Sequence, residues 1–413
     1  MKVLFVQVHS GIGGATTSMF QLIRELKSRG FKPEVLITGG EGPLVDWLRK
    51  EGIPVRLEKN LLSYGHGNGA RTEFWSIPPF RPITDLFKLR KSVKHYQKIF
   101  SEVNPDLVYL NSSILWPAAM AASRAGIHVV THVREVWYHG LFGIRKRFFI
   151  RLTERLSDHI FVLSHFSRSQ FSAETHNKIT VAYNAVDFER YDKVMGKKAS
   201  EMKAKVGLNP NKHVVIMLGG ALPHKGGAVF LKAASQILNK RIDVQFVVLG
   251  RVEPYYPEGN KSIKGRIRKL LVKDPGLYFQ QLAEKLALSN SLVLPGLVTN
   301  VPEWLKVSDV LVFPATTDHF GRPIIEAGYM QVPVLASDTD TSAELVNDGQ
   351  NGLLFKVNSP RDLSSKLAVL LGSGELRKRM GQEGKKLALE RYSLEKQLDI
   401  IVHVLNVTLS EAD

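Results

Sequence analysis

The chain has 413 residues, of which 44% are hydrophobic and 23% are charged. That length is enough for two or three globular domains with sizeable cores, and the composition excludes a disordered, collagen-like or coiled-coil chain. A net charge of +17 favours anionic partners, and the absence of cysteine excludes disulfides, cysteine-ligated zinc, iron–sulfur clusters and thiol catalysis.

Short apolar runs alternate with helical stretches along the whole chain. Runs of this kind, rich in Val, Ile and Leu, are typical of strands that are buried on both faces. The predicted strands are Val3–Val8, Val35–Thr38, Leu107–Asn111, Val129–His132, Ile160–Ser164, Ile179–Tyr183, Val214–Leu218, Val244–Gly250, Leu292–Gly296, Val310–Pro314, Val332–Ser337 and Gly352–Phe355. Their number and the intervening helices predict an α/β protein with two doubly wound, Rossmann-like parallel sheets.

The predicted domain boundary lies just after Asn184–Asp187, ahead of a Lys-rich connection. We expect a first domain over residues 1–190 and a second over 191–392. A C-terminal segment, 393–413, contains an amphipathic helix that we expect to pack on the first domain. Two such domains that face each other form a cleft, and ligands bind beyond the carboxyl ends of the strands. Polar motifs at strand ends are therefore the candidate sites.

The first such motif is a glycine-rich turn after the first predicted strand. Gly13 and Gly14 let the backbone approach an anion, and the helix that begins there supplies unpaired N–H groups. A tight strand–helix turn is the alternative interpretation. The dinucleotide-binding fingerprint fits poorly, because Thr16 stands where its third glycine is expected.

The second motif, Leu218–Gly227, follows the first strand of the second half. Lys225 lies at the mouth of a helix, where its charge can neutralise a diphosphate. His224 offers a further hydrogen-bond donor, and Gly220 belongs to the same candidate binding turn. An ordinary surface lysine is the alternative.

The third motif, Phe313–Ala327, combines a loop acid with a helix acid. Asp318 lies in the loop, and Glu326 lies in the first turns of the helix, so that each can accept hydrogen bonds from vicinal hydroxyls. The backbone around Phe320 and Gly321 exposes N–H groups. The alternatives are a capping role for Asp318 and a helix-dipole role for Glu326.

On these motifs the chain resembles the retaining family 4 of the GT-B glycosyltransferases, over nearly its whole length. The most specific parts are the spacing Asp318-x7-Glu326 with Phe320-Gly321 inside it, and the Lys225-Gly226 turn; Gly13-Gly14, Asn184-x-Val186-Asp187 and Arg391–Glu395 support them. The resemblance implies a GT-B fold whose second domain binds a UDP- or GDP-sugar as substrate and whose first domain binds the acceptor.

The resemblance also implies roles for individual residues. Glu326 would hold the ribose hydroxyls and Asp318 those of the donor sugar, while the backbone of His319, Phe320 and Gly321 would turn toward the sugar or phosphate. Lys225 would steady the leaving diphosphate. No carboxylate nucleophile, obligatory metal or other cofactor is then expected.

Two positions depart from the family pattern. Asp318 stands where a Glu is usual, and Gly220 stands where an Arg is usual, five residues before Lys225. His224 and Arg322 are the candidates that would replace the missing charge. These departures leave open a non-catalytic nucleotide-sugar-binding subunit, and a nucleotide-sugar epimerase is a further alternative.

A fourth site follows the predicted strand Val129–His132. In the resembling family a histidine near this place faces the donor sugar, so His132 is the candidate, and a buried structural histidine is the alternative. Arg134 and Glu135 either pair with each other or contact the acceptor. Asp338-Thr339-Asp340 is interpreted as a loop or helix cap and not as a metal site.

Two segments are both basic and apolar, Arg71–Phe100 and Leu141–Leu156. Such segments are typical of proteins that lie on an anionic leaflet, although a helix with one core face and one solvated face has the same composition. With no predicted signal peptide or transmembrane helix, we expect a cytoplasmic enzyme, peripheral at the inner face of the membrane, that builds a surface polysaccharide or glycolipid and does not bind nucleic acid.

Overall fold

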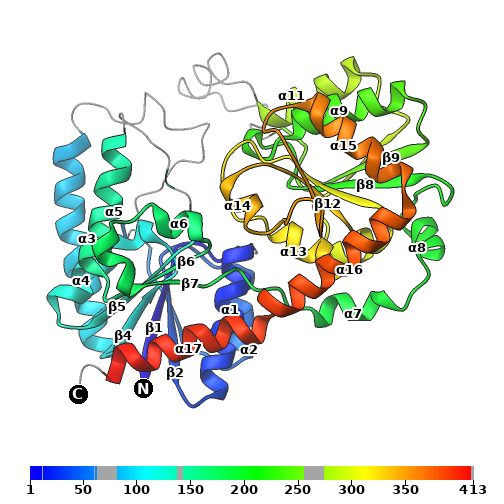
Figure 1. Ribbon diagram of the computed structural model, residues 1–413. Helices are drawn as coiled ribbons and strands as arrows, with labels where there is room; N and C mark the ends of the chain where they lie inside the picture. Colours follow the sequence, from blue (N-terminus) through cyan, green and yellow to red (C-terminus); the bar gives the residue numbers. More distant parts are fainter. Residues whose placement is uncertain are drawn as a thin grey trace. The chain divides into compact units, whose positions relative to one another are not determined.

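The computed structural model describes residues 1–11, 13–59, 61–62, 81–135, 137, 143–254 and 274–410. The chain forms two compact units, the first made of Met1–Ala185 with Glu395–Asp413 and the second of Val186–Leu394 (Figure 1). Each unit contains one parallel β-sheet covered by helices. The predicted α/β class with two Rossmann-like parallel sheets is therefore confirmed.

The first unit is built on a seven-stranded sheet in the order β3-β2-β1-β4-β5-β6-β7. Its strands are β1 (Lys2–Gln7), β2 (Lys32–Ile37), β3 (Val55–Leu57), β4 (Leu107–Leu110), β5 (His128–Val133), β6 (His159–Val162) and β7 (Ile179–Val181). Its helices are α1 (Gly14–Ser28), α2 (Pro43–Lys50), α3 (Arg81–Val103), α4 (Trp116–Arg124), α5 (Ile144–Leu156), α6 (His165–Ser169) and, from the far end of the chain, α17 (Leu394–Ser410).

The second unit is built on a six-stranded sheet in the order β10-β9-β8-β11-β12-β13. Its strands are β8 (His213–Leu218), β9 (Val244–Leu249), β10 (Leu292–Gly296), β11 (Val310–Phe313), β12 (Val334–Ser337) and β13 (Gly352–Phe355). Its helices are α7 (Glu189–Met195), α8 (Ala199–Lys205), α9 (Gly227–Asn239), α11 (Pro275–Lys285), α12 (Val301–Lys306), α13 (Arg322–Tyr329), α14 (Asp340–Ala343), α15 (Pro360–Gly372) and α16 (Gly374–Arg391).

All twelve predicted strands are present, and all are parallel to their neighbours. The interior strands are mostly buried because helices cover both faces of each sheet, which explains why their runs are continuously apolar. The edge strands β7, β10 and β13 are only partly buried, and Leu294 of β10 is 37% exposed. The sequence analysis missed β3. This strand has only three residues, all half-buried, and one of them is Arg56.

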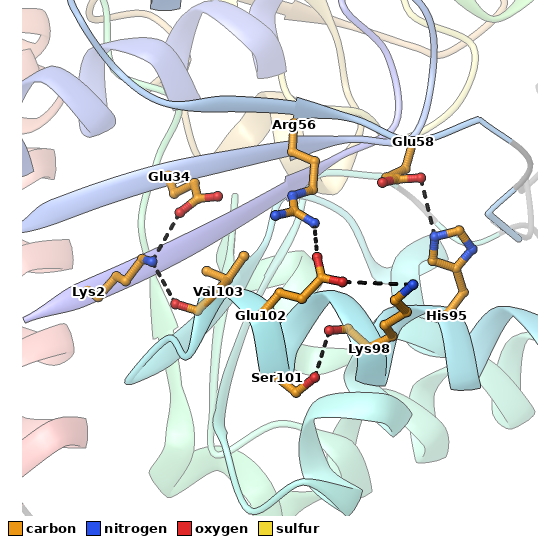
Figure 2. A network of polar contacts seen from close by, with 9 residues as sticks. All are labelled: Lys2, Glu34, Arg56, Glu58, His95, Lys98, Ser101, Glu102 and Val103. Carbon is orange, nitrogen blue, oxygen red and sulfur yellow. Dashed lines mark hydrogen bonds and ion pairs between the residues drawn. The ribbon is translucent and has the colours of Figure 1, made fainter.

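Polar contacts from strands β1 and β3 hold α3 against the first sheet (Figure 2). Lys2 of β1 bridges Glu34 of β2, at 3.2 Å, and the carbonyl of Val103 at the end of α3, at 2.6 Å. Arg56 of β3 pairs with Glu102 of α3. Exposed ion pairs of this kind contribute little to stability, so they orient the helix while its buried face holds it in place.

The strand order reverses once in each sheet, between β1 and β4 and between β8 and β11. In parallel sheets the loops that leave the carboxyl ends of such neighbouring strands diverge to opposite faces and form a ligand-binding crevice. The glycine-rich turn at Gly13 follows β1. The loops that carry Lys225 and Asp318 follow β8 and β11, so they belong to one switch point.

Candidate functional site

The loops after β8 and β11 contact each other directly. The backbone N–H of Thr316 donates to the carbonyl of His224 at 3.1 Å, and its hydroxyl donates to the carbonyl of Pro223 at 3.3 Å. Gly226 has φ +77°, and a Cβ atom there would lie 1.7 Å from the carbonyl oxygen of Pro314. Only glycine allows this approach, so the Lys225-Gly226 turn is what joins the two loops.

Lys225 is half-buried, and its aliphatic stem packs over Gly219, where an added Cβ would lie 3.1 Å from Lys225 Cγ and Cδ. Burial lowers the pKa of Lys225 to about 8. Within the part of the chain that the structure describes, its ammonium group has neither an ion pair nor a hydrogen bond. A desolvated cation without a carboxylate partner favours the binding of an anion.

Two histidines stand beside this lysine. The rings of His224 and His319 meet edge to face with their centroids 5.6 Å apart. Burial, together with the charge of Lys225, lowers the pKa of His224 to about 4 and that of His319 to about 3. Both rings are therefore neutral at pH 7, so Lys225 carries the charge of this trio.

Gly220 cannot hold the arginine that the family pattern places there. Its φ is +67°, and a Cβ atom would lie 2.3 Å from the carbonyl oxygen of Arg251, which accepts a hydrogen bond from the backbone of Ala221 at 2.9 Å. The two suggested replacements do not supply a free charge either. His224 is neutral, and Arg322 lies against Glu326.

Asp318 is held by the N-terminus of α14. Its Oδ1 accepts hydrogen bonds from the backbone N–H of Thr341 at 3.0 Å and from the Thr341 hydroxyl at 3.2 Å, and that hydroxyl also lies 3.2 Å from the carbonyl of His319. This arrangement matches the capping interpretation of Asp318. Binding of sugar hydroxyls by its carboxylate stays a prediction.

Glu326 lies in the second turn of α13, with its side chain 10% exposed. Its Oε1 is 2.8 Å from Arg322 Nε, although the Nε–H does not meet hydrogen-bond geometry, so the pairing is electrostatic. Tyr191 of α7 lies beside it, and burial, with Glu326 adding to the effect, raises the pKa of Tyr191. These neighbours orient the carboxylate, and its ribose-binding role stays a prediction.

Phe320 and Gly321 lead into α13. Phe320 is half-buried, and Gly321 is the buried N-cap residue, which provides no side-chain cap. The helix therefore begins without a side-chain acceptor, which leaves its positive end available to an anion or a hydroxyl.

In the first unit, Gly13 and Gly14 are exposed at the start of α1. Gly13 is the N-cap and also provides no side-chain cap. Its φ of −168° is extended backbone that any residue can adopt. A glycine here removes side-chain bulk in front of the first N–H groups of the helix.

His132 lies inside the core of the first unit, only 1% exposed. Its Nδ1 is 2.6 Å from the hydroxyl of Tyr109, and its ring packs 5.6 Å from that of Phe161. Burial, and then the charge of Arg134, lowers the pKa of His132 well below its usual value. Its Nε2 is buried without a hydrogen-bond partner among the described residues, so the ring is only half satisfied. The catalytic role and the structural interpretation both stay predictions.

Arg134 holds the strand ends of the first unit together. Its Nε donates to Asn111 and its Nη1 to Asn184, each at 2.6 Å, and Asn111 donates to Gln7 at 2.7 Å. Glu135 instead accepts hydrogen bonds from Ser112 and Ser113. The side chains of Arg134 and Glu135 therefore turn to different partners and do not form an ion pair with each other, which was one of the two alternatives. Contact with the acceptor stays a prediction.

The sequence analysis missed Gln7, Asn111 and Thr341 as site-building residues. The sequence pattern could have indicated Gln7 and Asn111, because each is a polar residue at the carboxyl end of an apolar run. Thr341 gave no such signal, since its contact with Asp318 joins two different loops. The predicted cap at Asp338–Asp340 is present: the Thr339 side chain accepts a hydrogen bond from the backbone of Ser342.

Two further findings concern the described residues as a set. They contain no group of three or more His, Asp or Glu side chains placed to hold a metal ion. None of their helices is both long and apolar enough to cross a membrane. Residues 71–80 and 141–142 of the two basic segments lie outside the described residues.

Both halves of the chain match known families. Residues 198–387 match the family described as Glycosyl transferases group 1, and residues 12–190 match Glycosyltransferase Family 4. An uncharacterized glycosyltransferase of Methanocaldococcus jannaschii is 26% identical over 254 residues, which is 62% of this chain and 61% of that protein, so the match spans less than two thirds of that relative.

Two longer matches extend over most of the chain. The Escherichia coli UDP-Gal:alpha-D-GlcNAc-diphosphoundecaprenol alpha-1,3-galactosyltransferase is 25% identical over 374 residues, which is 87% of this chain and 84% of that protein. The solved structure of Anabaena HepE with UDP-glucose has a TM-score of 0.74 at 20% identity, covering 98% of this chain and all of that one. The second likeness concerns the fold alone.

Proposed function

The chain belongs to the group 1 glycosyltransferases of GT-B fold, and we propose that it is a retaining enzyme that transfers a sugar from a nucleotide-sugar to a glycan or lipid-linked acceptor. The observation that carries the proposal is the joined pair of loops after β8 and β11, which carries the desolvated ammonium of Lys225, a group without a partner among the described residues. A nucleoside diphosphate supplies the anion that such a group requires.

The chemistry of the transfer follows from this arrangement. The departing diphosphate gains negative charge in the transition state, and a positioned cation in a water-poor site stabilises that charge more than it stabilises the bound substrate. We assign this role to Lys225, and the start of α13, which has no side-chain cap, adds a positive dipole end. The reaction needs neither a metal ion nor another cofactor in this proposal.

The acceptor class is inferred from relatives. One acts on a diphosphoundecaprenol-linked sugar by its name, and another is a capsular polysaccharide biosynthesis glycosyltransferase of Staphylococcus aureus, 22% identical over 89% of this chain and 94% of that one. A lipid-linked acceptor would require the enzyme to work at an anionic membrane surface from the cytoplasmic side.

Helix α5 supports such a membrane location. Ile144 and Phe148 are 67% and 54% exposed, and Arg147, Arg151 and Arg155 are exposed on the same helix. The only acid in α5, Glu154, is buried and accepts hydrogen bonds from Ser172 and Thr175 instead. Exposed apolar side chains among arginines are complementary to an anionic leaflet.

A thermal-shift screen with UDP- and GDP-sugars tests the donor assignment. A ligand at 100 times its Kd stabilises the protein by about 2.7 kcal/mol, which raises the unfolding temperature. We expect Glu326→Ala to lose this response and Glu383→Ala, at an exposed position of α16, to keep it. A retained response in Glu326→Ala would refute the ribose assignment.

Transfer is tested with the bound donor and a polyprenyl-diphosphate-linked sugar, and the anomeric configuration of the product is read by NMR. Retention supports the proposal, whereas inversion contradicts it. Binding without transfer to any acceptor would favour a non-catalytic nucleotide-sugar-binding subunit, which the glycine at position 220 motivates. Failure of every nucleotide-sugar to bind would end the donor hypothesis.

A further inference from the structure

The ring of His319 has a defined orientation in the loop between β11 and α13. Its Nδ1 lies 3.0 Å from the carbonyl oxygen of Thr317, and its ring packs against Phe313, with the centroids 5.2 Å apart. A carbonyl oxygen can only accept a hydrogen bond, so Nδ1 carries the proton. In a neutral imidazole the other nitrogen, Nε2, is then a bare acceptor.

This acceptor is buried and has no hydrogen-bond partner among the described residues. A buried acceptor without a donor is unfavourable, and such atoms in folded proteins call for an explanation. Burial and the neighbouring charge of Lys225 keep the ring neutral at pH 7, because they lower the pKa of His319 to about 3. The ring therefore does not take up a second proton, and Nε2 stays an acceptor without a donor.

His319 and Lys225 favour different groups of a ligand, because Nε2 accepts a hydrogen bond and the ammonium donates one. The ammonium of Lys225 attracts a phosphate oxygen. A phosphate oxygen at neutral pH has no proton to give, so it is repelled by the lone pair of His319 Nε2, whereas a hydroxyl group can donate to that nitrogen. A sugar diphosphate carries both features side by side, since a hydroxyl-bearing ring is attached directly to the phosphate.

We propose that His319 Nε2 accepts a hydrogen bond from a hydroxyl of the transferred sugar, so that this side chain distinguishes a nucleotide-sugar from the free nucleoside diphosphate. The inference rests on the proposed function and goes beyond it by giving the imidazole a role in recognising the sugar. His319 is thus a specificity-determining residue at the Lys225 site.

The test compares two classes of ligand, nucleotide-sugars and nucleoside diphosphates, by calorimetry in the full-length protein. UDP-glucose, UDP-galactose and GDP-mannose are titrated beside UDP and GDP into the wild type, His319→Phe and His319→Gln. Phe keeps an aromatic ring against Phe313 but offers no acceptor, and the side-chain oxygen of Gln restores one. His403→Phe, at an exposed position of α17, is the matched control.

We expect His319→Phe to bind the nucleotide-sugar about tenfold more weakly while its affinity for the parent diphosphate stays within about twofold, because one hydrogen bond is lost. The unfolding temperature of the free variant should change little, because the loss of the hydrogen bond to the exposed Thr317 is offset by the removal of an unpaired buried acceptor. His319→Gln should recover part of the loss, and His403→Phe should match the wild type.

Deoxy-sugar donors then identify the hydroxyl. The donor that lacks it should bind the wild type and His319→Phe equally well. An equal loss of sugar-nucleotide and diphosphate affinity, or no loss of either, would overturn the inference while leaving the proposed function standing. A wild type that binds none of the five ligands would overturn both.

Discussion

At the scale of single residues, the charge of the candidate site rests on Lys225. The flanking histidines are neutral, and Arg322 is committed to Glu326, so no second cation of these loops compensates for the missing arginine at Gly220. Because burial lowers the pKa of Lys225 to about 8, its charge is also sensitive to pH near neutrality.

Substitution of Lys225 should therefore change both rate and pH dependence. We expect Lys225→Ala to lose roughly 3 to 4 kcal/mol of transition-state stabilisation, a hundred- to thousandfold loss in kcat. In the wild type, kcat/KM should fall as the pH rises through about 8, because the ammonium of the free enzyme loses its proton.

The control for this prediction is Lys225→Arg, whose guanidinium keeps its charge at all relevant pH values. Whatever its absolute rate, this variant should lose the alkaline limb of the kcat/KM profile. A limb near pH 8 that persists in Lys225→Arg would show that another group controls it.

At the scale of elements, the contact between the loops after β8 and β11 depends on backbone approach. β8 and β11 are neighbours in the sheet although 91 residues separate the end of one from the start of the other (218 and 310). Their loops meet where Gly226 lies against Pro314, and glycine is required there for two reasons, the positive φ and the absence of space for Cβ.

A comparison of Gly226→Ala with Gly349→Ala distinguishes the effect of the positive φ from the effect of the missing space for Cβ. Both glycines have nearly the same φ, +77° and +78°, but a Cβ at Gly349 meets nothing within 4 Å. Each variant should lose roughly 1 kcal/mol of unfolding free energy from the left-handed backbone, and Gly226→Ala a further 1–3 kcal/mol or so from overpacking.

Chemical denaturation measures the unfolding free energy of each variant, and the thermal shift on adding the donor measures whether the variant still binds it. Gly226→Ala should also lose the donor response, because the displaced loops no longer position Lys225. If both variants were equally stable and both bound donor, the junction between the loops would not be needed for the site.

At the scale of the whole molecule, a net charge of +17 accompanies the exposed apolar side chains Ile144 and Phe148 of α5. Each exposed arginine near an anionic leaflet contributes about 1 kcal/mol, and burying a phenylalanine contributes roughly 1.5–3 kcal/mol. Phe148→Asp should therefore reduce binding to phosphatidylglycerol vesicles by tenfold or more.

Co-sedimentation measures this binding, with phosphatidylcholine vesicles as the uncharged reference. The matched control is Val369→Asp, which alters a residue of α15 that is 56% exposed in the second unit. If Val369→Asp lost as much binding as Phe148→Asp, or if the wild type bound both lipids equally, α5 would not be a membrane-docking surface.

The sequence by itself determined the local part of this protein. Uninterrupted apolar runs made twelve strands predictable, whereas β3 was not, because it has three half-buried residues and one of them is Arg56. The amphipathic helix predicted within residues 393–413 is present as α17, Leu394–Ser410. Its apolar spacing sets the buried face formed by Leu398, Ile401, Val402 and Leu405.

Only the tertiary structure decided how the site is assembled. The order of the strands brings the loops after β8 and β11 together, and a hydrogen bond to Thr341 commits one oxygen of Asp318. The approach of Arg251 excludes any side chain at Gly220, and burial places His132 in the core. These outcomes depend on contacts between segments far apart in the chain, which spacing and composition do not encode, because local patterns specify elements while packing specifies their neighbours.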